Sequence, residues 1–227
     1  MPGRLIAIEG IDGSGKGTQA KLLYERLRRE GRKVALLSFP RYSETRFGGY
    51  IGEYLNGRFG TLEQVHPFLA ALLFSGDRFE SRGLLLDALA TNDVVICDRY
   101  VGSNIAHQGA RVPAEERSEF IARIEAVEYE VFALPRPDRT ILLDLSVANA
   151  TRLIATKAKR EYTERTADLH EAASGYLESV RSVYRTLAVA SADWEIIPCE
   201  TDGAVRPIEE IAKDVYRSAG NVGQAPA

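Results

Sequence analysis

One short segment near the start of the chain restricts the possible folds more than any other. Residues 10–18 read Gly-Ile-Asp-Gly-Ser-Gly-Lys-Gly-Thr, directly after an apolar run at 5–8 and before a stretch with helical spacing. Glycines let successive backbone N–H groups turn inward around an anion, and the start of a helix adds a partial positive charge. Lys16 adds a full positive charge. The segment therefore predicts a phosphate-binding loop between a strand and a helix.

The loop departs from the strict form of this motif at one position. The strict pattern has Ser or Thr directly after the lysine, whereas this chain has Gly17 there and Thr18 next. The hydroxyl group that usually contacts magnesium is therefore displaced, and Thr18 is its candidate substitute. The candidate phosphate-binding residues are Gly10, Ile11, Asp12, Gly13, Ser14, Gly15, Lys16, Gly17 and Thr18.

The rest of the chain alternates between two patterns. Short apolar runs rich in branched residues, typical of strands buried on both faces, lie at 5–8, 34–37, 94–97, 141–145 and 194–197. Helical spacing occurs between them, and we expect helices at about 46–56, 61–90 and 169–187. This alternation predicts an α/β fold with a mostly parallel sheet. We expect one domain over 1–217 and a disordered tail over 218–227.

Composition excludes several other classes of protein. The chain has 227 residues, 45% of them hydrophobic, and a net charge of −3, so it can bury a core but has no general attraction to nucleic acid or acidic membranes. We expect no signal peptide and no membrane span, because the run at 5–8 is too short and no stretch approaches about 20 apolar residues. Two cysteines in the whole chain are typical of a reducing compartment, and we expect a cytoplasmic protein.

The second apolar run ends in Phe39-Pro40-Arg41-Tyr42. Pro40 forces a turn, and a bond before proline is one that can be cis. Adenylate kinases also carry a Phe-Pro-Arg segment, after a different strand. The local sequence fits an ordinary strand-ending turn equally well.

Phe74 and Arg78 lie in a segment with helical spacing, 73–78, and share one face because they are four residues apart. An aromatic ring can stack on a base, and a guanidinium, which only donates hydrogen bonds, suits a keto oxygen and rejects the amino group of cytosine. The alternative interpretation is a core Phe beside a surface Arg.

Several polar residues follow the third apolar run, where ligands bind in open α/β sheets. Asp98 is the candidate acid near magnesium, through water, and Arg99 is the candidate bridge between two phosphate groups. A salt bridge at the strand end is the alternative. Ser103, Asn104 and His107 come next, and the amide of Asn104 can match the N3–H and carbonyl edge of thymine. His107 fits a packed or surface histidine better than a proton carrier.

A basic segment stands out in this acidic chain. Residues 152–165 contain five basic and two acidic side chains. Such a run usually marks a solvated face, but it is also what a lid needs if it closes over a phosphate group and excludes water.

Taken together and in this order, EGIDGSGKGTQ, FPRY, LLFSGDR, DRYVGSN and the basic segment resemble the thymidylate kinase family across nearly the whole chain. The resemblance implies a three-layer P-loop NTPase fold of the nucleoside monophosphate kinases, with a five-stranded parallel sheet flanked by helices. It also implies a short mobile lid at about 152–167 and a homodimer. The implied activity is the phosphorylation of dTMP to dTDP with ATP and Mg²⁺.

The resemblance also assigns roles to individual residues. Asp12 would hold the acceptor sugar hydroxyl and help to organise magnesium, Phe74 would stack on thymine, and Tyr42 would line the acceptor pocket. The candidate dTMP-binding residues are Asp12, Phe39, Pro40, Tyr42, Phe74, Arg78, Arg99, Ser103, Asn104 and His107. The candidate catalytic residues are Lys16, Asp98, Arg99, Arg160 and Arg165, and the candidate metal ligands are Asp12, Thr18 and Asp98.

Two positions depart from the family pattern. Some members carry an Arg in the P-loop where this chain has Gly13, so the catalytic Arg is expected in the lid, at Arg160 or Arg165. Some bacterial members have Tyr in place of His107, where it crowds the ribose 2′ position, so deoxyribose selection is left open.

Two other functions stay open as well. One is a kinase for another nucleoside monophosphate, such as dUMP or AMP, because GSGKGTQ also resembles adenylate kinases. The other is a non-catalytic nucleotide-binding P-loop protein.

Overall fold

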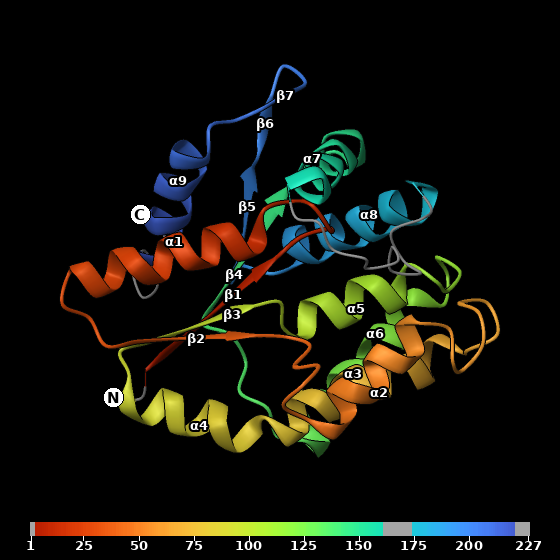
Figure 1. Ribbon diagram of the computed structural model, residues 1–227. Helices are drawn as coiled ribbons and strands as arrows, with labels where there is room; N and C mark the ends of the chain where they lie inside the picture. Colours follow the sequence, from red (N-terminus) through yellow and green to blue (C-terminus); the bar gives the residue numbers. More distant parts are fainter. Residues whose placement is uncertain (1–2, 161–173, 221–227) are drawn as a thin grey trace.

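The computed structural model describes residues 3–160 and 174–220. Within them, five strands form one parallel sheet in the order β2-β3-β1-β4-β5, which confirms the expected sheet. The strands are β1 (Arg4–Glu9), β2 (Val34–Ser38), β3 (Val94–Asp98), β4 (Arg139–Asp144) and β5 (Trp194–Pro198). A short antiparallel hairpin, not expected from the sequence, pairs β6 (Glu200–Thr201) with β7 (Ala204–Val205) and projects beside the end of the sheet (Figure 1).

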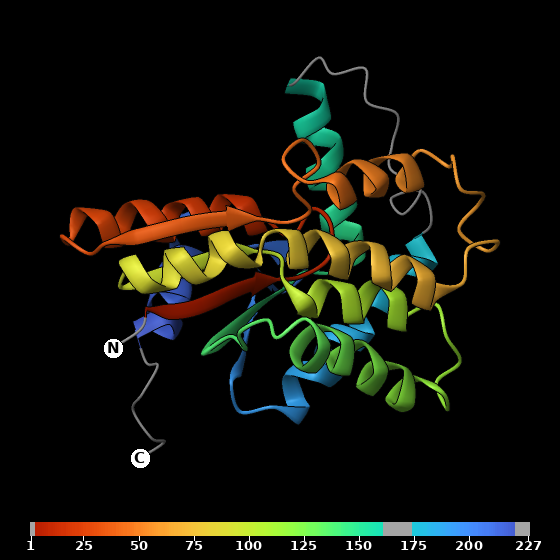
Figure 2. The ribbon, with the colours of Figure 1, turned by 90° about the horizontal axis from the view of Figure 1, so that it is seen from below.

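Helices cover both faces of the sheet. In chain order they are α1 (Lys16–Arg29), α2 (Arg46–Leu55), α3 (Pro67–Glu80), α4 (Arg82–Thr91), α5 (Val101–Gly109), α6 (Arg117–Glu125), the π-helix η1 (Ala126–Val131), α7 (Val147–Arg160), α8 (Ser174–Ala190) and α9 (Ile208–Gly220). Helices α1 and α9 lie on one face and α4 on the other, which gives three layers (Figures 1 and 2). No helix in the described part of the chain is both long and apolar enough to span a bilayer.

The alternation of side chains along the strands builds two cores. In β1, Ile6 and Ile8 pack into one core with α1, α8 and α9, whereas Leu5 and Ala7 pack into the other with α3, α4, α5 and α6. Successive residues of a strand point to opposite faces, so a strand that is buried on both faces needs apolar residues throughout. This requirement explains the continuous apolar runs in the sequence.

Two expected boundaries were wrong. The helix expected over 61–90 is two helices, α3 and α4, and α3 begins only at Pro67. Proline suits the first position of a helix because the N–H that it lacks would have no partner there. His66 caps α3, since its ring Nδ1 accepts a hydrogen bond from the Phe68 amide (3.2 Å). The tail expected from 218 begins too early, because α9 continues to Gly220 and Ser218 is fully buried in its last turn. Residues 161–173 and 221–227, including the start of the helix expected at 169–187, lie outside the described residues.

The parallel sheet brings the predicted site residues to one edge. All strands run the same way, so the segments that follow β1, β2 and β3 meet at their carboxyl ends. The first two segments carry the phosphate loop and the turn at Pro40, and β3 itself ends in Asp98. In open α/β sheets, ligands bind beyond this edge.

Candidate active site

The loop after β1 has the backbone shape of a phosphate-binding loop. Gly10, Gly13 and Gly15 have φ angles of 146°, 82° and 92°, a region that side chains disfavour. Gly15 is the N-cap of α1, so the amides of the first helical turn face the loop. Lys16 curls back over it, and its Nζ donates to the carbonyl oxygen of Ile11 (2.7 Å). The loop therefore presents backbone donors and one ammonium group to an anion.

Two glycines of this loop have close neighbours. A Cβ at Gly13 would lie 2.5 Å from the carbonyl oxygen of Ala150 in α7, so no side chain, and hence no arginine, fits there. A Cβ at Gly17 would lie 3.0 Å from Oδ2 of Asp98. The first contact explains why this chain lacks a P-loop arginine, and the second brings the carboxylate that ends β3 against the start of α1.

Lys16 is almost completely buried. Burial, together with the positive charge of Arg99, lowers its pKa from 10.5 to about 8. The carboxylate of Asp12, 4.0 Å away, opposes the shift but does not cancel it. The loop is therefore poised to gain from an incoming anion.

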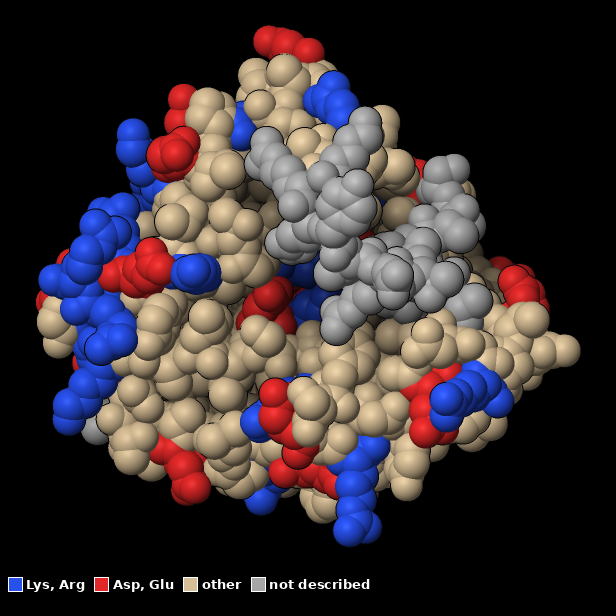
Figure 3. All heavy atoms as spheres, viewed as in Figure 1, with Lys and Arg blue, Asp and Glu red and all other residues tan. Residues whose placement is uncertain are grey.

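Arg99 lies between the phosphate loop and α5. Its guanidinium forms an ion pair with Asp12, and its Nη1 donates to Ser103 Oγ (3.3 Å) and lies 3.4 Å from His107 Nε2. Its φ angle of 65° is unusual for a side-chain-bearing residue, and such strain is concentrated at functional sites. Figure 3 shows acidic and basic side chains meeting in a hollow near the centre of this face of the molecule.

Ser103 is held from behind by a buried carboxylate that the sequence reasoning missed. Glu9, the last residue of β1, accepts hydrogen bonds from the amides of Tyr100 (2.8 Å) and Ser103 (3.0 Å) and from Ser103 Oγ (2.6 Å). Tyr184 of α8 donates to the same carboxylate (3.1 Å). Glu9 therefore caps α5 and fixes the strand end that carries Arg99.

Asp98 is the candidate metal ligand that the structure leaves available. Within residues 3–160 and 174–220 its carboxylate makes no hydrogen bond or ion pair, whereas Asp12 is committed to Arg99 and Thr18 is exposed on α1. No group of three or more His, Cys, Asp or Glu side chains gathers around a metal site in that part of the chain. Mg²⁺ typically takes one or two carboxylates and completes its shell with substrate phosphates and water. The residues present fit that mode of binding.

The turn after β2 is tied to α3. The Phe39–Pro40 peptide bond is cis, and the amide of Arg41 donates to Asp77 Oδ2 (3.0 Å). Asp77 is buried in α3 and also accepts from Thr45 Oγ1 (2.5 Å). The turn thus lies against the helix that carries Phe74 and Arg78.

One pocket gathers all ten candidate dTMP-binding residues. It is lined by Asp12, Phe39, Pro40, Tyr42, Phe74, Arg78, Arg99, Ser103, Asn104 and His107, together with Leu55, Tyr100 and Gln108, which the sequence reasoning missed. Its walls come from the phosphate loop, the cis-proline turn and helices α2, α3 and α5. Phe74, on one wall, meets Tyr54 edge to face with ring centroids 6.5 Å apart.

Arg78, at the far end of the pocket, belongs to a buried ion pair. Arg78 is 3% exposed and donates from Nε to Oε2 of Glu128 (3.0 Å) and from Nη2 to Oε1. The expected alternative, a surface arginine, is therefore wrong. Asn104 Nδ2 donates to Glu128 Oε1 (2.9 Å), and Asn104 Oδ1 is buried without a hydrogen-bond partner among the described residues. Glu128 gave no signal in the sequence, because it is 50 residues from Arg78 and has no motif around it.

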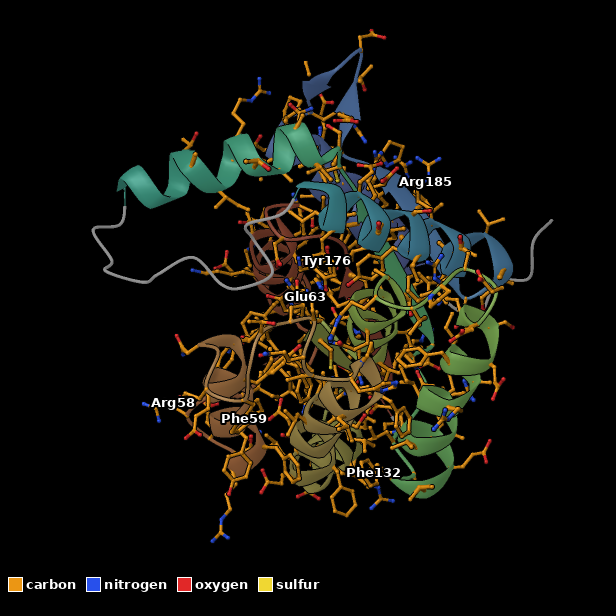
Figure 4. All side chains as sticks on the ribbon, turned by 90° about the vertical axis from the view of Figure 1, so that its right-hand side faces the viewer. Arg58, Phe59, Glu63, Phe132, Tyr176 and Arg185 are labelled. Carbon is orange, nitrogen blue, oxygen red and sulfur yellow. The ribbon has the colours of Figure 1, made fainter. Side chains whose placement is uncertain are left out.

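His107 is not isolated. Its Nδ1 lies 3.2 Å from the hydroxyl of Tyr176, which donates to the His107 backbone carbonyl (3.0 Å). Tyr176, labelled in Figure 4, lies near the start of α8 and is half-buried. The sequence reasoning included Tyr176 only in the apolar face of a helix and missed this contact with the site.

The expected lid is described only in part. Residues 152–160 belong to α7, which approaches the phosphate loop at Gly13. Residues 161–167, including Arg165, and the side chain of Arg160 lie outside the described residues.

Comparisons with known proteins agree with this geometry. The family model described as Thymidylate kinase matches residues 8–197. Thymidylate kinase of Mycobacterium tuberculosis is 33% identical over 200 residues, 87% of this chain and 92% of that protein, and thymidylate kinase of Exiguobacterium sibiricum is 28% identical over 218 residues, 95% of each. The solved structure of thymidylate kinase from Candida albicans, 24% identical, shares the fold with a TM-score of 0.73 over 97% of this chain and 92% of that one. The chain therefore belongs to the thymidylate kinase family and is a nucleoside monophosphate kinase.

Proposed function

We propose that the protein transfers the γ-phosphoryl group of ATP to dTMP, giving ADP and dTDP. The observation that carries this proposal is the single pocket that runs from Asp12 and Arg99, beside the phosphate loop, to Arg78 and Asn104. A nucleoside monophosphate in this pocket has its phosphate next to the loop and its base against Phe74.

The base end suits a keto pyrimidine with a protonated N3. Asn104 Oδ1 is an unsatisfied acceptor, which matches the N3–H of thymine, and Arg78 supplies donors for a carbonyl oxygen. Cytosine presents an acceptor at N3 and an amino group beside it, so both contacts would be lost. A site built to hydrogen-bond one edge strongly rejects an edge that leaves its buried polar groups unpaired.

The phosphate end performs the transfer mainly by position and charge. The loop amides and Lys16 hold the donor phosphates, and Arg99 aligns donor and acceptor and offsets their repulsion. The acceptor phosphate is already an anion at neutral pH, so no strong general base is needed. We assign the stabilisation of the moving phosphoryl group to a lid arginine, Arg160 or Arg165, since the contact of Gly13 with α7 leaves no room for an arginine in the loop.

We infer that Mg²⁺ accompanies ATP. Asp98 would hold it, directly or through water, with Thr18 as the nearby hydroxyl and Asp12 organising the surrounding water. When bound, Mg²⁺ supplies positive charge between the β- and γ-phosphates. The oxygen ligands available at the end of β3 support this assignment.

We also propose a cytoplasmic homodimer. Leu69 and Phe79 of α3, Leu84 of α4 and Val131 of η1 are exposed large apolar side chains, and we assign the contact between the two copies to them. Phe79 and Phe132 stack with ring centroids 4.6 Å apart, and Phe132 lies at the edge of the molecule in Figure 4. A second copy of the chain is the occupant we expect, and light scattering on the purified protein would measure it. The free, buried thiols of Cys97 and Cys199 support the cytoplasmic location.

An assay of ADP release with ATP and a panel of acceptors tests the proposed reaction. The panel is dTMP, dUMP, dCMP, AMP and GMP at equal concentrations. We expect the largest kcat/KM with dTMP. A larger value for AMP would favour a different nucleoside monophosphate kinase, and no turnover with any acceptor would favour a non-catalytic nucleotide-binding protein.

A further inference from the structure

Glu128 is a fully buried carboxylate that reaches the base end of the pocket without lining it. It lies in the π-helix η1, across from α3, and its side chain is 0% exposed. Short π-helices are rare and occur frequently at functional sites. A buried carboxylate is tolerated only when its charge and its lone pairs are satisfied, so its partners determine its role.

Those partners include both residues that we assign to the base. Oε1 of Glu128 accepts from Ser75 Oγ (2.8 Å), Asn104 Nδ2 (2.9 Å) and Arg78 Nη2, and Oε2 accepts from Arg78 Nε (3.0 Å). One carboxylate therefore holds the amide and the guanidinium together.

The contacts of Asn104 fix which way its amide faces. Its Nδ2 is close to three acceptors: the carbonyl oxygen of Ala71 (3.1 Å), Ser75 Oγ (3.2 Å) and Glu128 Oε1 (2.9 Å). The reversed amide would place Oδ1 against the carboxylate and the carbonyl oxygen, which is repulsive. Oδ1 is therefore the atom left over, and it has no partner among the described residues.

The contacts of Arg78 fix its guanidinium in the same way. Nε and Nη2 are both used by Glu128 in a two-point ion pair. The N–H groups on Nη1 carry no hydrogen bond within the described part of the chain. These contacts thus leave over one acceptor, Oδ1 of Asn104, and the N–H groups on Nη1 of Arg78, on two residues that line the pocket.

We propose that Glu128 is a positioning residue that sets this pattern of one acceptor and adjacent donors, and thereby the preference for a thymine-like edge over cytosine. The inference rests on the proposed assignment of Asn104 and Arg78 as base contacts. Glu128 touches neither the base nor the phosphates. It acts, together with the carbonyl oxygen of Ala71, by preventing the amide of Asn104 from turning over.

Glu128→Gln tests the proposal. An amide at position 128 can present an N–H to Asn104, so that of the two oxygens that repel a reversed amide only the Ala71 carbonyl remains. Asn104 can then turn over and present its own N–H to N3 of cytosine. We expect the ratio of kcat/KM for dTMP to kcat/KM for dCMP to fall at least ~10-fold, with KM for dTMP raised about 10-fold and KM for ATP changed less than about 2-fold. Glu130→Gln is the matched control, since it makes the same change at an exposed residue of the same helix.

A second variant separates positioning from folding, because Glu128→Gln leaves Arg78 without its buried counter-charge. Glu128→Asp keeps the charge but withdraws the carboxylate, and we expect the dTMP:dCMP ratio to fall at least ~3-fold in protein whose thermal unfolding is still cooperative. An unchanged ratio in Glu128→Asp, or equal losses of kcat/KM for dTMP and dCMP in Glu128→Gln, would overturn the proposal. If the unaltered enzyme itself does not prefer dTMP to dCMP, the base contacts are wrongly assigned and the role of Glu128 fails with them.

Discussion

Lys16→Met should make the unliganded protein more stable while weakening its binding of ATP. Lys16 is 6% exposed, and its pKa of about 8 in the folded protein lies below the ordinary value of 10.5. The folded state therefore binds the Lys16 proton less tightly than the unfolded state does. At pH 7 the side chain is still charged, and this charge lowers the free energy of unfolding by about 3 kcal/mol. Methionine has a similar length and no charge, but it loses the hydrogen bond to Ile11, worth about 1 kcal/mol. The expected net gain is about 2 kcal/mol.

The gain should depend on pH in a defined direction. The cost is fully present below pH 8, where Lys16 is charged in the folded and the unfolded protein, and it disappears as the pH rises from 8 to 10.5. Thermal unfolding without nucleotide should show a Tm raised by about 4–8 °C at pH 7, for a gain of about 2 kcal/mol in a chain of this size. At pH 9.5 the gain should fall below about 1 kcal/mol. Lys21→Met, at an exposed lysine of the same helix, is the control.

The same group should make ATP binding pH-dependent. If bound phosphates require the ammonium form of Lys16, the affinity of the unaltered protein for a non-hydrolysable ATP analogue should fall about 10-fold between pH 7 and pH 9. Lys16→Met should bind the analogue weakly at both pH values and with little change between them. A Lys16→Met protein that is less stable than the unaltered one at pH 7, or an ATP affinity that does not change with pH in the unaltered protein, would refute this account of the loop.

Four further substitutions test other parts of the site. Arg160→Ala or Arg165→Ala should lower kcat by at least ~100-fold without a matching loss of dTMP affinity in titration calorimetry, and the lid assignment is wrong if neither slows turnover. Arg78→Ala should weaken dTMP binding, spare ATP binding and lower the free energy of unfolding by about 3 kcal/mol, because it leaves Glu128 buried without a counter-charge; equal losses for both nucleotides would count against a base contact. Gly13→Ala should lower the free energy of unfolding by at least about 1 kcal/mol, since its φ angle is positive and its Cβ would collide with α7; denaturant unfolding with an unchanged midpoint would contradict the close approach.

Local sequence was sufficient for the five strands of the parallel sheet, the phosphate loop and most of the pocket lining. A strand buried on both faces must be apolar throughout, so β1 and β3 are evident from their continuous apolar runs. Parallel strands end at one edge, so residues such as Asp12, Phe39 and Asn104, which follow different strands, could be expected in one place. The pocket gathers them as expected. The lid assignment remains a prediction.

The residues that were missed act across the fold. Glu128 reaches Arg78 and Asn104 only because η1 packs against α3, and no spacing in the sequence encodes that contact. Tyr176 reaches His107 only because α8 packs against α5, which is likewise a contact between distant parts of the chain. The break between α3 and α4 at Ser81 is marked by a single nearby glycine, Gly83, which lies inside the first turn of α4. The last turn of α9 is kept helical by burial rather than by its own composition.

The sheet divides the interior into two cores, and this division separates two tasks. The core shared by α1, α8 and α9 supports the helix that begins at the phosphate loop, whereas the core of α3, α4, α5 and α6 supports the helices that carry Phe74, Arg78 and Asn104. Repacking the second core should therefore shift acceptor preference while the handling of ATP stays intact. A search for variants that accept unnatural nucleotides would begin on that side of the sheet.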